Sequence, residues 1–197
     1  MTKKIKNLAF TLIELLTVMT VIAILAGLIL SVAGYVQRKG GMSRAQAEIK
    51  ALEGAAENYK TDNGIYPSDP TPGTATDKLD ARTAISEANY QVASFVLYKL
   101  LTGDTGGTGA ATQSYFPVPP GMCGRPNVAA PVSKSNAVTY LMDPFGNSYG
   151  YSTIQQYQNQ QGTFNPAKPV GYNPTFDLWC TVGQTTGTNS ITWIKNW

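Results

Sequence analysis

The chain begins with an almost uninterrupted apolar run. Residues 8–30 read LAFTLIELLTVMTVIAILAGLIL and contain one ionisable side chain, Glu14. A helix rises about 1.5 Å per residue, so residues 10–30 are long enough to cross the roughly 30 Å hydrocarbon core of a bilayer. The run passes into a polar helix rather than a small-residue cleavage site, unlike an ordinary secretory signal. The pattern therefore predicts a transmembrane helix over residues 10–34.

A helical pattern of another kind follows the apolar run. We expect the helix to loosen at Gly34, Gly40 and Gly41 and to resume as an amphipathic helix at about residues 43–62. Apolar residues recur there at spacings of four and three, which places them on one helix face; they are Ala45, Ile49, Leu52, Ala56 and Tyr59. This face is predicted to pack on the core of a domain, with contact to neighbouring helices as the alternative. Residues 60–64 predict the end of the helix.

The remaining chain alternates turn-rich segments with shorter elements. Residues 63–137 predict loops around a second helix at residues 81–101, with Asp80 as its cap and Gly103 as its end. Two short runs around residues 143–147 predict a hairpin.

Two more strand-like pieces, residues 176–182 and 191–197, complete a predicted β-sheet region at residues 138–197. The whole pattern predicts an α+β fold. Its long N-terminal helix has a transmembrane half and an amphipathic half, and it packs on a small C-terminal antiparallel sheet.

Composition narrows the range of functions. The chain has 197 residues and no histidine, which excludes Ser/His/Asp and Cys/His catalysis and any His-ligated metal. It has 15 basic and 12 acidic residues, but Lys3, Lys4 and Lys6 precede the apolar run, and the chain after residue 9 is neutral. We therefore expect no nucleic-acid partner. The same three lysines predict a cytoplasmic N-terminus and an exported C-terminal domain, residues 35–197.

Glu14 is the unusual residue of the apolar run. An acid at the centre of a membrane costs roughly 2.5–3.5 kcal/mol on insertion scales, so Glu14 must lie near the interface, be protonated or be paired. One interpretation is an interfacial acid that extends toward the lipid headgroups. The other requires a cation from another chain or from a newly made N-terminus.

The N-terminal residues resemble those of type IV pilins and type II secretion pseudopilins. The resemblance rests on a short basic leader ending in a small residue, followed by FTLIELL at residues 10–16 and a long apolar helix. It implies a type IV pilin-like fold and cleavage of a leader, residues 1–9, between Ala9 and Phe10 by prepilin peptidase. It also implies N-methylation of Phe10 and pairing of Glu14 with the amine of a neighbouring subunit. The family usually has Gly where this chain has Ala9.

The resemblance implies a structural subunit and not an enzyme. Such a subunit polymerises through its N-terminal helices with copies of itself and with minor pseudopilins, and it depends on an inner-membrane assembly platform and on membrane lipid. It would be a single-pass inner-membrane protein with a periplasmic domain, assembled into a periplasmic filament that supports export across the outer membrane. The alternatives are a pilin of a surface type IV pilus, used for adhesion, motility or DNA uptake, and a membrane-tethered enzyme or binding domain.

The C-terminal part resembles the G-type major pseudopilins, through DPFGN at residues 143–147 and the segment at residues 176–197. These proteins commonly bind calcium through an acid-rich loop before the final Trp. Residues 183–190 here contain no acid, and Asp177 alone does not replace the missing charges. We expect no metal and no cofactor, and a loop held by hydrogen bonds instead.

Cys123 and Cys180 are the two cysteines of the chain, and both lie in the predicted exported domain. In an oxidising compartment they are expected to form a disulfide. The alternative is two separate buried thiols.

Overall fold

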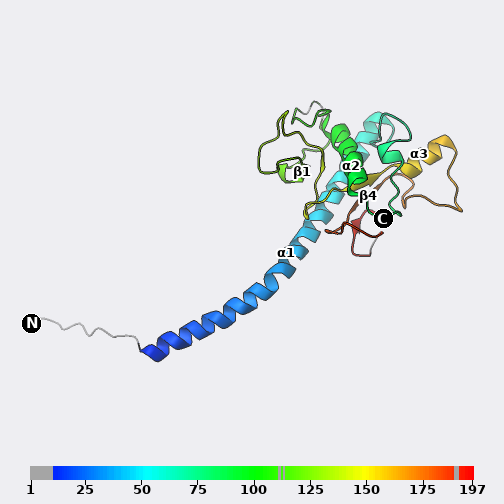
Figure 1. Ribbon diagram of the computed structural model, residues 1–197. Helices are drawn as coiled ribbons and strands as arrows, with labels where there is room; N and C mark the ends of the chain where they lie inside the picture. The colour runs from blue at the N-terminus through cyan, green and yellow to red at the C-terminus, as the bar shows by residue number, and fades with distance from the viewer. Residues whose placement is uncertain (1–10, 111, 113, 189–190) are drawn as a thin grey trace, which may run out of the picture. The chain divides into compact units, whose positions relative to one another are not determined.

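Two compact units make up the chain in the computed structural model, which describes residues 11–110, 112, 114–188 and 191–197. Unit 1 comprises residues 1–40 and unit 2 comprises residues 41–197. Helix α1, Leu12–Asn63, contributes to both (Figure 1). The other elements lie in unit 2: η1 Ala75–Asp77, α2 Glu87–Thr102, η2 Pro120–Met122, β1 Cys123–Gly124, β2 Tyr140–Leu141, β3 Gly150–Ser152, α3 Ile154–Gln161, β4 Asp177–Cys180 and β5 Ile194–Lys195.

The glycines of α1 do not interrupt it, contrary to the prediction. The helix is assigned without a break through Gly34, Gly40 and Gly41. A glycine costs a helix about 1 kcal/mol relative to alanine but keeps its backbone hydrogen bonds, so isolated glycines weaken a helix without ending it. Gly41 also has a packing role, because a Cβ there would lie 3.1 Å from Cζ of the Phe145 ring.

Both long helices end where the sequence predicts. Gly64 and Gly103 have positive φ angles of 79° and 71°, which a residue without Cβ adopts freely. Their N–H groups donate to the carbonyl oxygens of Lys60 and Lys99, at 2.7 Å and 2.8 Å. Each glycine therefore closes the last turn of its helix.

The predicted start of the second helix was wrong. Helix α2 begins at Glu87 with Ser86 as its N-cap residue, whereas Asp80 forms a turn in which its Oδ1 accepts the N–H of Arg82 at 2.9 Å. Asp80 Oδ1 also accepts the N–H of Gly171 at 3.0 Å. Contacts with a segment distant in sequence therefore hold Asp80 outside the helix.

The strands form two small antiparallel sheets. In one sheet β1 pairs with β2; in the other, the order is β3–β4–β5, with Gly150 opposite Trp179 and Trp179 opposite Lys195. The strand-like pieces predicted at residues 176–182 and 191–197 are thus confirmed as β4 and β5. The α+β fold with a long N-terminal helix is also confirmed, and it is consistent with a type IV pilin-like fold.

The hairpin around residues 143–147 is present as a tight turn with a short antiparallel pairing of the flanking residues. Asp143 N–H donates to the carbonyl oxygen of Asn147 at 2.7 Å, and Met142 and Ser148 form an isolated bridge. Beyond this bridge the N–H of Tyr149 still donates to the carbonyl oxygen of Leu141 at 2.9 Å, and the main strand partners are then β1 for β2 and β4 for β3. The predicted hairpin is therefore present, but it is short.

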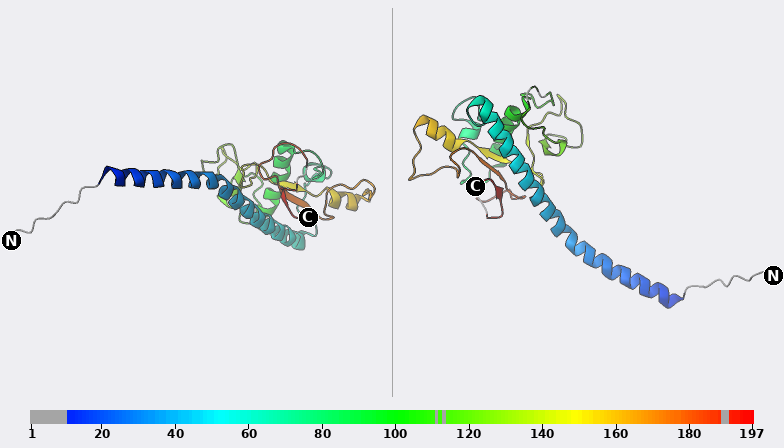
Figure 2. Two further views of the ribbon diagram at one scale, coloured as in Figure 1. Left: turned by 90° about the horizontal axis from the view of Figure 1, so that it is seen from below. Right: turned by 180° about the vertical axis from the view of Figure 1, so that it is seen from behind.

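The C-terminal part of α1 supplies one side of the core of unit 2. Its buried residues are Ala45, Ile49, Leu52, Ala55 and Ala56, four of which the spacing predicted, while Tyr59 is partly buried. They join one apolar cluster with Leu97 and Leu101 of α2 and with Leu141 and Leu178 of the sheets. Figure 2 shows this part of α1 crossing the strands. A second cluster is centred on Trp179 and includes Leu79, Ala81, Tyr90, Ala93 and Trp193.

Candidate functional site

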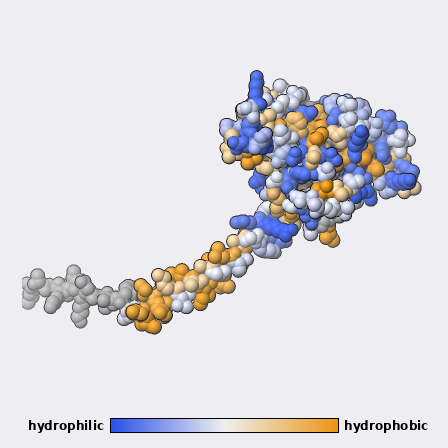
Figure 3. Space-filling view, viewed as in Figure 1, coloured by the Kyte–Doolittle hydropathy of each residue, from blue (hydrophilic) through white to orange (hydrophobic). Residues whose placement is uncertain are grey.

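The apolar part of α1 is exposed in unit 1. All described residues from 11 to 40 are exposed, and the exposed side chains include Leu12 at 82% and Leu30 at 77%. Figure 3 shows apolar side chains along this stretch. Among the described residues, α1 is the one helix long and apolar enough to cross a membrane. Since water would penalise so much apolar surface, this stretch requires a bilayer or other helices around it.

Glu14 lies in the first turn of α1 and is bonded within that turn. Its Oε2 accepts the N–H of Thr11 at 2.8 Å and the hydroxyl of Thr11 at 2.7 Å. The N–H of Glu14 donates to Thr11 Oγ1 at 3.3 Å. This reciprocal arrangement is a capping box, which satisfies backbone donors that have no partner inside the helix.

The role of Thr11 was not predicted, although the sequence contains its signal. Thr11 and Glu14 have the Thr-x-x-Glu spacing of a capping box, immediately before an apolar run. The capping box explains how one chain accommodates the acid. It leaves Glu14 Oε1 with acceptor capacity for another donor. Ala9 and Phe10, the residues of the predicted cleavage and methylation, lie outside the described residues.

The two cysteines are free thiols in this structure, which corresponds to the alternative of two separate buried thiols rather than to the expected disulfide. The thiol of Cys180 donates to Asp143 Oδ2 at 3.0 Å, whereas the thiol of Cys123 donates to the carbonyl oxygen of Pro119 at 3.6 Å. Burial raises the pKa of both thiols. Both are therefore held as neutral, hydrogen-bonded groups.

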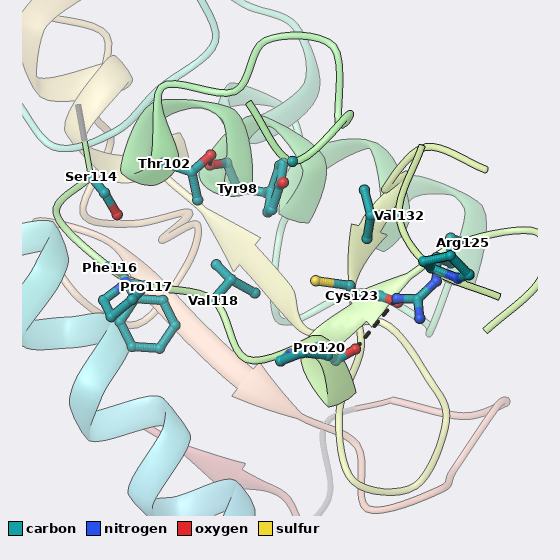
Figure 4. A pocket seen from close by; sticks show the side chains of 12 residues that line it. Tyr98, Thr102, Ser114, Phe116, Pro117, Val118, Pro120, Cys123, Arg125 and Val132 are labelled. Carbon is teal, nitrogen blue, oxygen red and sulfur yellow. Dashed lines mark hydrogen bonds between the residues drawn. The ribbon is translucent and has the colours of Figure 1, made fainter. Parts of the chain in front are cut away.

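Cys123 borders a cavity of about 600 Å³ (Figure 4). The lining is mainly apolar and includes Phe116, Val118 and Val132. At its edge, the guanidinium of Arg125 donates to the carbonyl oxygens of Ala130, Cys123, Val128 and Pro120. The arginine thus holds the loop beside the cavity in place, because its guanidinium group is hydrogen-bonded to backbone carbonyl oxygens.

The loop between β4 and β5 does not fit a calcium ion. Ca²⁺ takes six to eight oxygen ligands, several of them usually carboxylates, and residues 183–190 contain none. Within the described residues, no group of three or more Asp, Glu, Cys or His side chains is placed to hold a metal. The nearby Asp177 carboxylate instead accepts the N–H groups of Tyr172 and Asn173, both at 2.8 Å.

Comparisons with known proteins agree on the N-terminal signal. Residues 5–30 match a family described as the prokaryotic N-terminal methylation motif. Three relatives are each named type II secretion system core protein G. The protein from Vibrio cholerae serotype O1 is 35% identical over 68 residues, 34% of this chain and 47% of the relative. The Aeromonas hydrophila protein is 35% identical over 66 residues, with 34% and 46% covered, and the Escherichia coli K12 protein is 36% identical over 63 residues, with 32% and 43% covered.

The chain spans just under half the length of these curated relatives. No solved structure gives a significant match to it. The methylation motif lies where the capping box and the apolar helix begin, and the α+β architecture is consistent with a type IV pilin-like fold. Together, the motif, the fold and these relatives make the chain similar to the G-type pseudopilins of type II secretion.

Proposed function

We propose that this protein is a structural subunit of a type II secretion pseudopilus. The observation that carries the proposal is the methylation motif at residues 5–30, placed at the start of an apolar helix whose described side chains are exposed. The similarity to core protein G favours a pseudopilus over the alternative, a pilin of a surface type IV pilus. In this function the protein is not an enzyme, and it supports export across the outer membrane as part of a filament.

The proposed orientation follows from the charges that flank the apolar run. Lys3, Lys4 and Lys6 favour a cytoplasmic N-terminus, and in the proposed orientation unit 2 is periplasmic and residues 10–34 lie in the inner membrane. The partners are copies of the same chain, minor pseudopilins, prepilin peptidase and the assembly platform of the inner membrane. Lipid surrounds the apolar helix before assembly, and neighbouring helices replace it in the filament.

Processing is the first step that can be tested. Cleavage between Ala9 and Phe10, followed by methylation of the Phe10 amine, gives a mature chain of defined mass. Intact mass spectrometry of the protein from its native membrane measures both events together. A mature chain that starts at Met1, or at any residue other than Phe10, would contradict this part of the proposal.

Glu14 is proposed to set the register between subunits. In the single chain its Oε2 is held by Thr11, and we propose that the Phe10 amine of a neighbouring subunit binds the carboxylate in the filament. In a low-dielectric environment this pairing is strong, and it offsets the cost of placing an acid in lipid.

Variants at two positions separate the capping role of Glu14 from the proposed pairing role. Glu14→Gln and Glu14→Ala are expected to insert and to be cleaved, because the peptidase acts on a single chain, but to assemble poorly. Thr11→Ala is the control, because it removes the capping partner and keeps the carboxylate. Assembly is measured by crosslinking of cysteine pairs introduced in the helix at residues 10–30, together with secretion. Normal crosslinking and secretion by Glu14→Ala would refute the pairing and favour an interfacial acid.

A further inference from the structure

The loop between β4 and β5 is held by hydrogen bonds that centre on Gln184. The side-chain Oε1 of Gln184 accepts the indole N–H of Trp193. The backbone N–H of Gln184 donates to the carbonyl oxygen of Thr181 at 3.1 Å, and its carbonyl oxygen accepts the hydroxyl of Thr181 at 2.7 Å. One residue thus connects the end of β4 to the segment that leads into β5.

The indole that Gln184 holds belongs to the core. Trp193 is 4% exposed and lies in the second apolar cluster with Trp179 and Tyr90. A buried indole N–H without an acceptor would be costly. Further along the loop, the carbonyl oxygen of Gly187 accepts the N–H of Ile85 at 2.8 Å, just before α2 begins. The loop therefore joins the sheet to the entry of α2.

The backbone at the start of this loop is in an unfavourable conformation. Val182 has a φ angle of 55°, a region that β-branched residues rarely adopt, and Gly183 follows with a φ angle of 82°. Val182 is nevertheless 5% exposed and packs in the main core cluster. Surrounding contacts must hold such a turn in place, and the hydrogen bonds of Gln184 close it directly.

Among the described residues of this loop, several oxygens that could bind a cation already accept hydrogen bonds. The carbonyl oxygens of Thr181, Gln184 and Gly187 accept hydrogen bonds from within the protein, and so does the side-chain oxygen of Gln184. None of these oxygens carries a formal charge. A divalent cation bound to these oxygens would displace their hydrogen bonds, and no carboxylate of the loop would compensate as a ligand.

We propose that the hydrogen bonds of Gln184 hold the β4–β5 loop in place without a cation. The acid-rich loops of G-type pseudopilins commonly bind calcium, whereas here an amide oxygen and an indole N–H hold the loop. The stability of unit 2 is then not coupled to the calcium concentration, because a ligand that does not bind the folded state cannot stabilise it. This inference concerns the single chain and does not rest on assembly into a filament.

The test uses the full-length chain in detergent micelles, with EDTA or with excess CaCl₂. Near-UV circular dichroism follows thermal unfolding of unit 2, and NMR follows hydrogen exchange of the Trp193 indole N–H. The variants are Gln184→Ala, which removes the acceptor oxygen, and Gln184→Glu, which keeps one. Gln160→Ala, a change at an exposed glutamine of α3, is the matched control.

Wild-type protein is expected to have the same unfolding midpoint in EDTA and in calcium. Gln184→Ala should lower the midpoint by about 3–6 °C and accelerate indole exchange about tenfold. Gln184→Glu should retain the indole protection, which distinguishes a lost acceptor from general damage to the loop. If Gln184→Ala does not fold, Gln184→Glu must still fold and protect the indole.

Either of two results would overturn the proposal. The first is a wild-type midpoint that falls on chelation and recovers with calcium. The second is a Gln184→Ala variant whose midpoint and indole exchange match those of Gln160→Ala.

Discussion

Gly150 lies opposite the largest buried side chain of the three-stranded sheet. It pairs with Trp179, which is fully buried, and a Cβ at position 150 would overlap Cε2, Cζ2 and Nε1 of the indole. The indole cannot easily move away, because the rings of Tyr90 and Trp197 pack against it with centroids at 5.3 Å and 5.9 Å. We therefore expect Gly150→Ala to be strongly destabilising.

The expected cost lies at the upper end of the range for overpacking, about 3 kcal/mol of the free energy of unfolding. For a domain of this size it corresponds to a fall in the unfolding midpoint of about 6–12 °C. Gly54→Ala is a matched control with the opposite sign. Gly54 is an exposed position inside α1 with no atom within 4 Å of a built Cβ, so alanine should stabilise the helix by about 1 kcal/mol.

Thermal unfolding of the full-length chain in detergent, followed by near-UV circular dichroism, measures both variants. The signal reports mainly the packing of the buried aromatic side chains of unit 2, which contains all three tryptophans. A midpoint for Gly150→Ala within about 2 °C of wild type would show that the sheet accommodates the methyl group. The close packing of Gly150 against Trp179 would then not determine the stability of this sheet.

Three further predictions concern hydrogen bonds and titratable groups in unit 2. Tyr149→Phe removes a hydroxyl that donates to Glu48 Oε2 at 2.6 Å, and urea unfolding should show a loss of about 1.5–3 kcal/mol; an unchanged midpoint would contradict this. Burial raises the pKa of Asp177 from 3.8 to about 6, so its stabilising contribution is complete below pH 3.8 and is lost as the pH rises through 6. The free energy of unfolding of the wild type should therefore fall more steeply over this pH range than that of Asp177→Asn. Parallel pH profiles of the two proteins would contradict the raised pKa of Asp177. Cys123 and Cys180 should resist a thiol reagent in the native state and give two thiols after denaturation without reductant, whereas no thiols before reduction would indicate a disulfide.

Features that depend on neighbouring residues were predictable from the sequence. The apolar run identified the membrane-compatible helix because a helix of that length needs no other segment to form its hydrogen bonds. Gly64 and Gly103 identified the ends of two helices because a positive φ angle is a local requirement. The core face of α1 followed from the helical repeat.

Features that depend on distant residues were not predictable in this way. The local turn at residues 143–147 predicted the short hairpin, but it did not predict that β2 also pairs with β1 and that β3 pairs with β4. Asp80 is a reasonable helix cap by sequence, yet its carboxylate is used by Gly171, 91 residues away.

The sequence alone determined that this protein has a membrane-compatible helix, a pilin-like N-terminal motif and a β4–β5 loop without acids. Only the tertiary structure decided how that loop is held. The indole N–H of Trp193 reaches its acceptor, Gln184 Oε1, only when the two segments pack against each other. It likewise decided that Cys123 and Cys180 have separate partners. Sequence specifies which groups are available, but the pairing of buried polar groups depends on packing, since each must find a partner where the core places it.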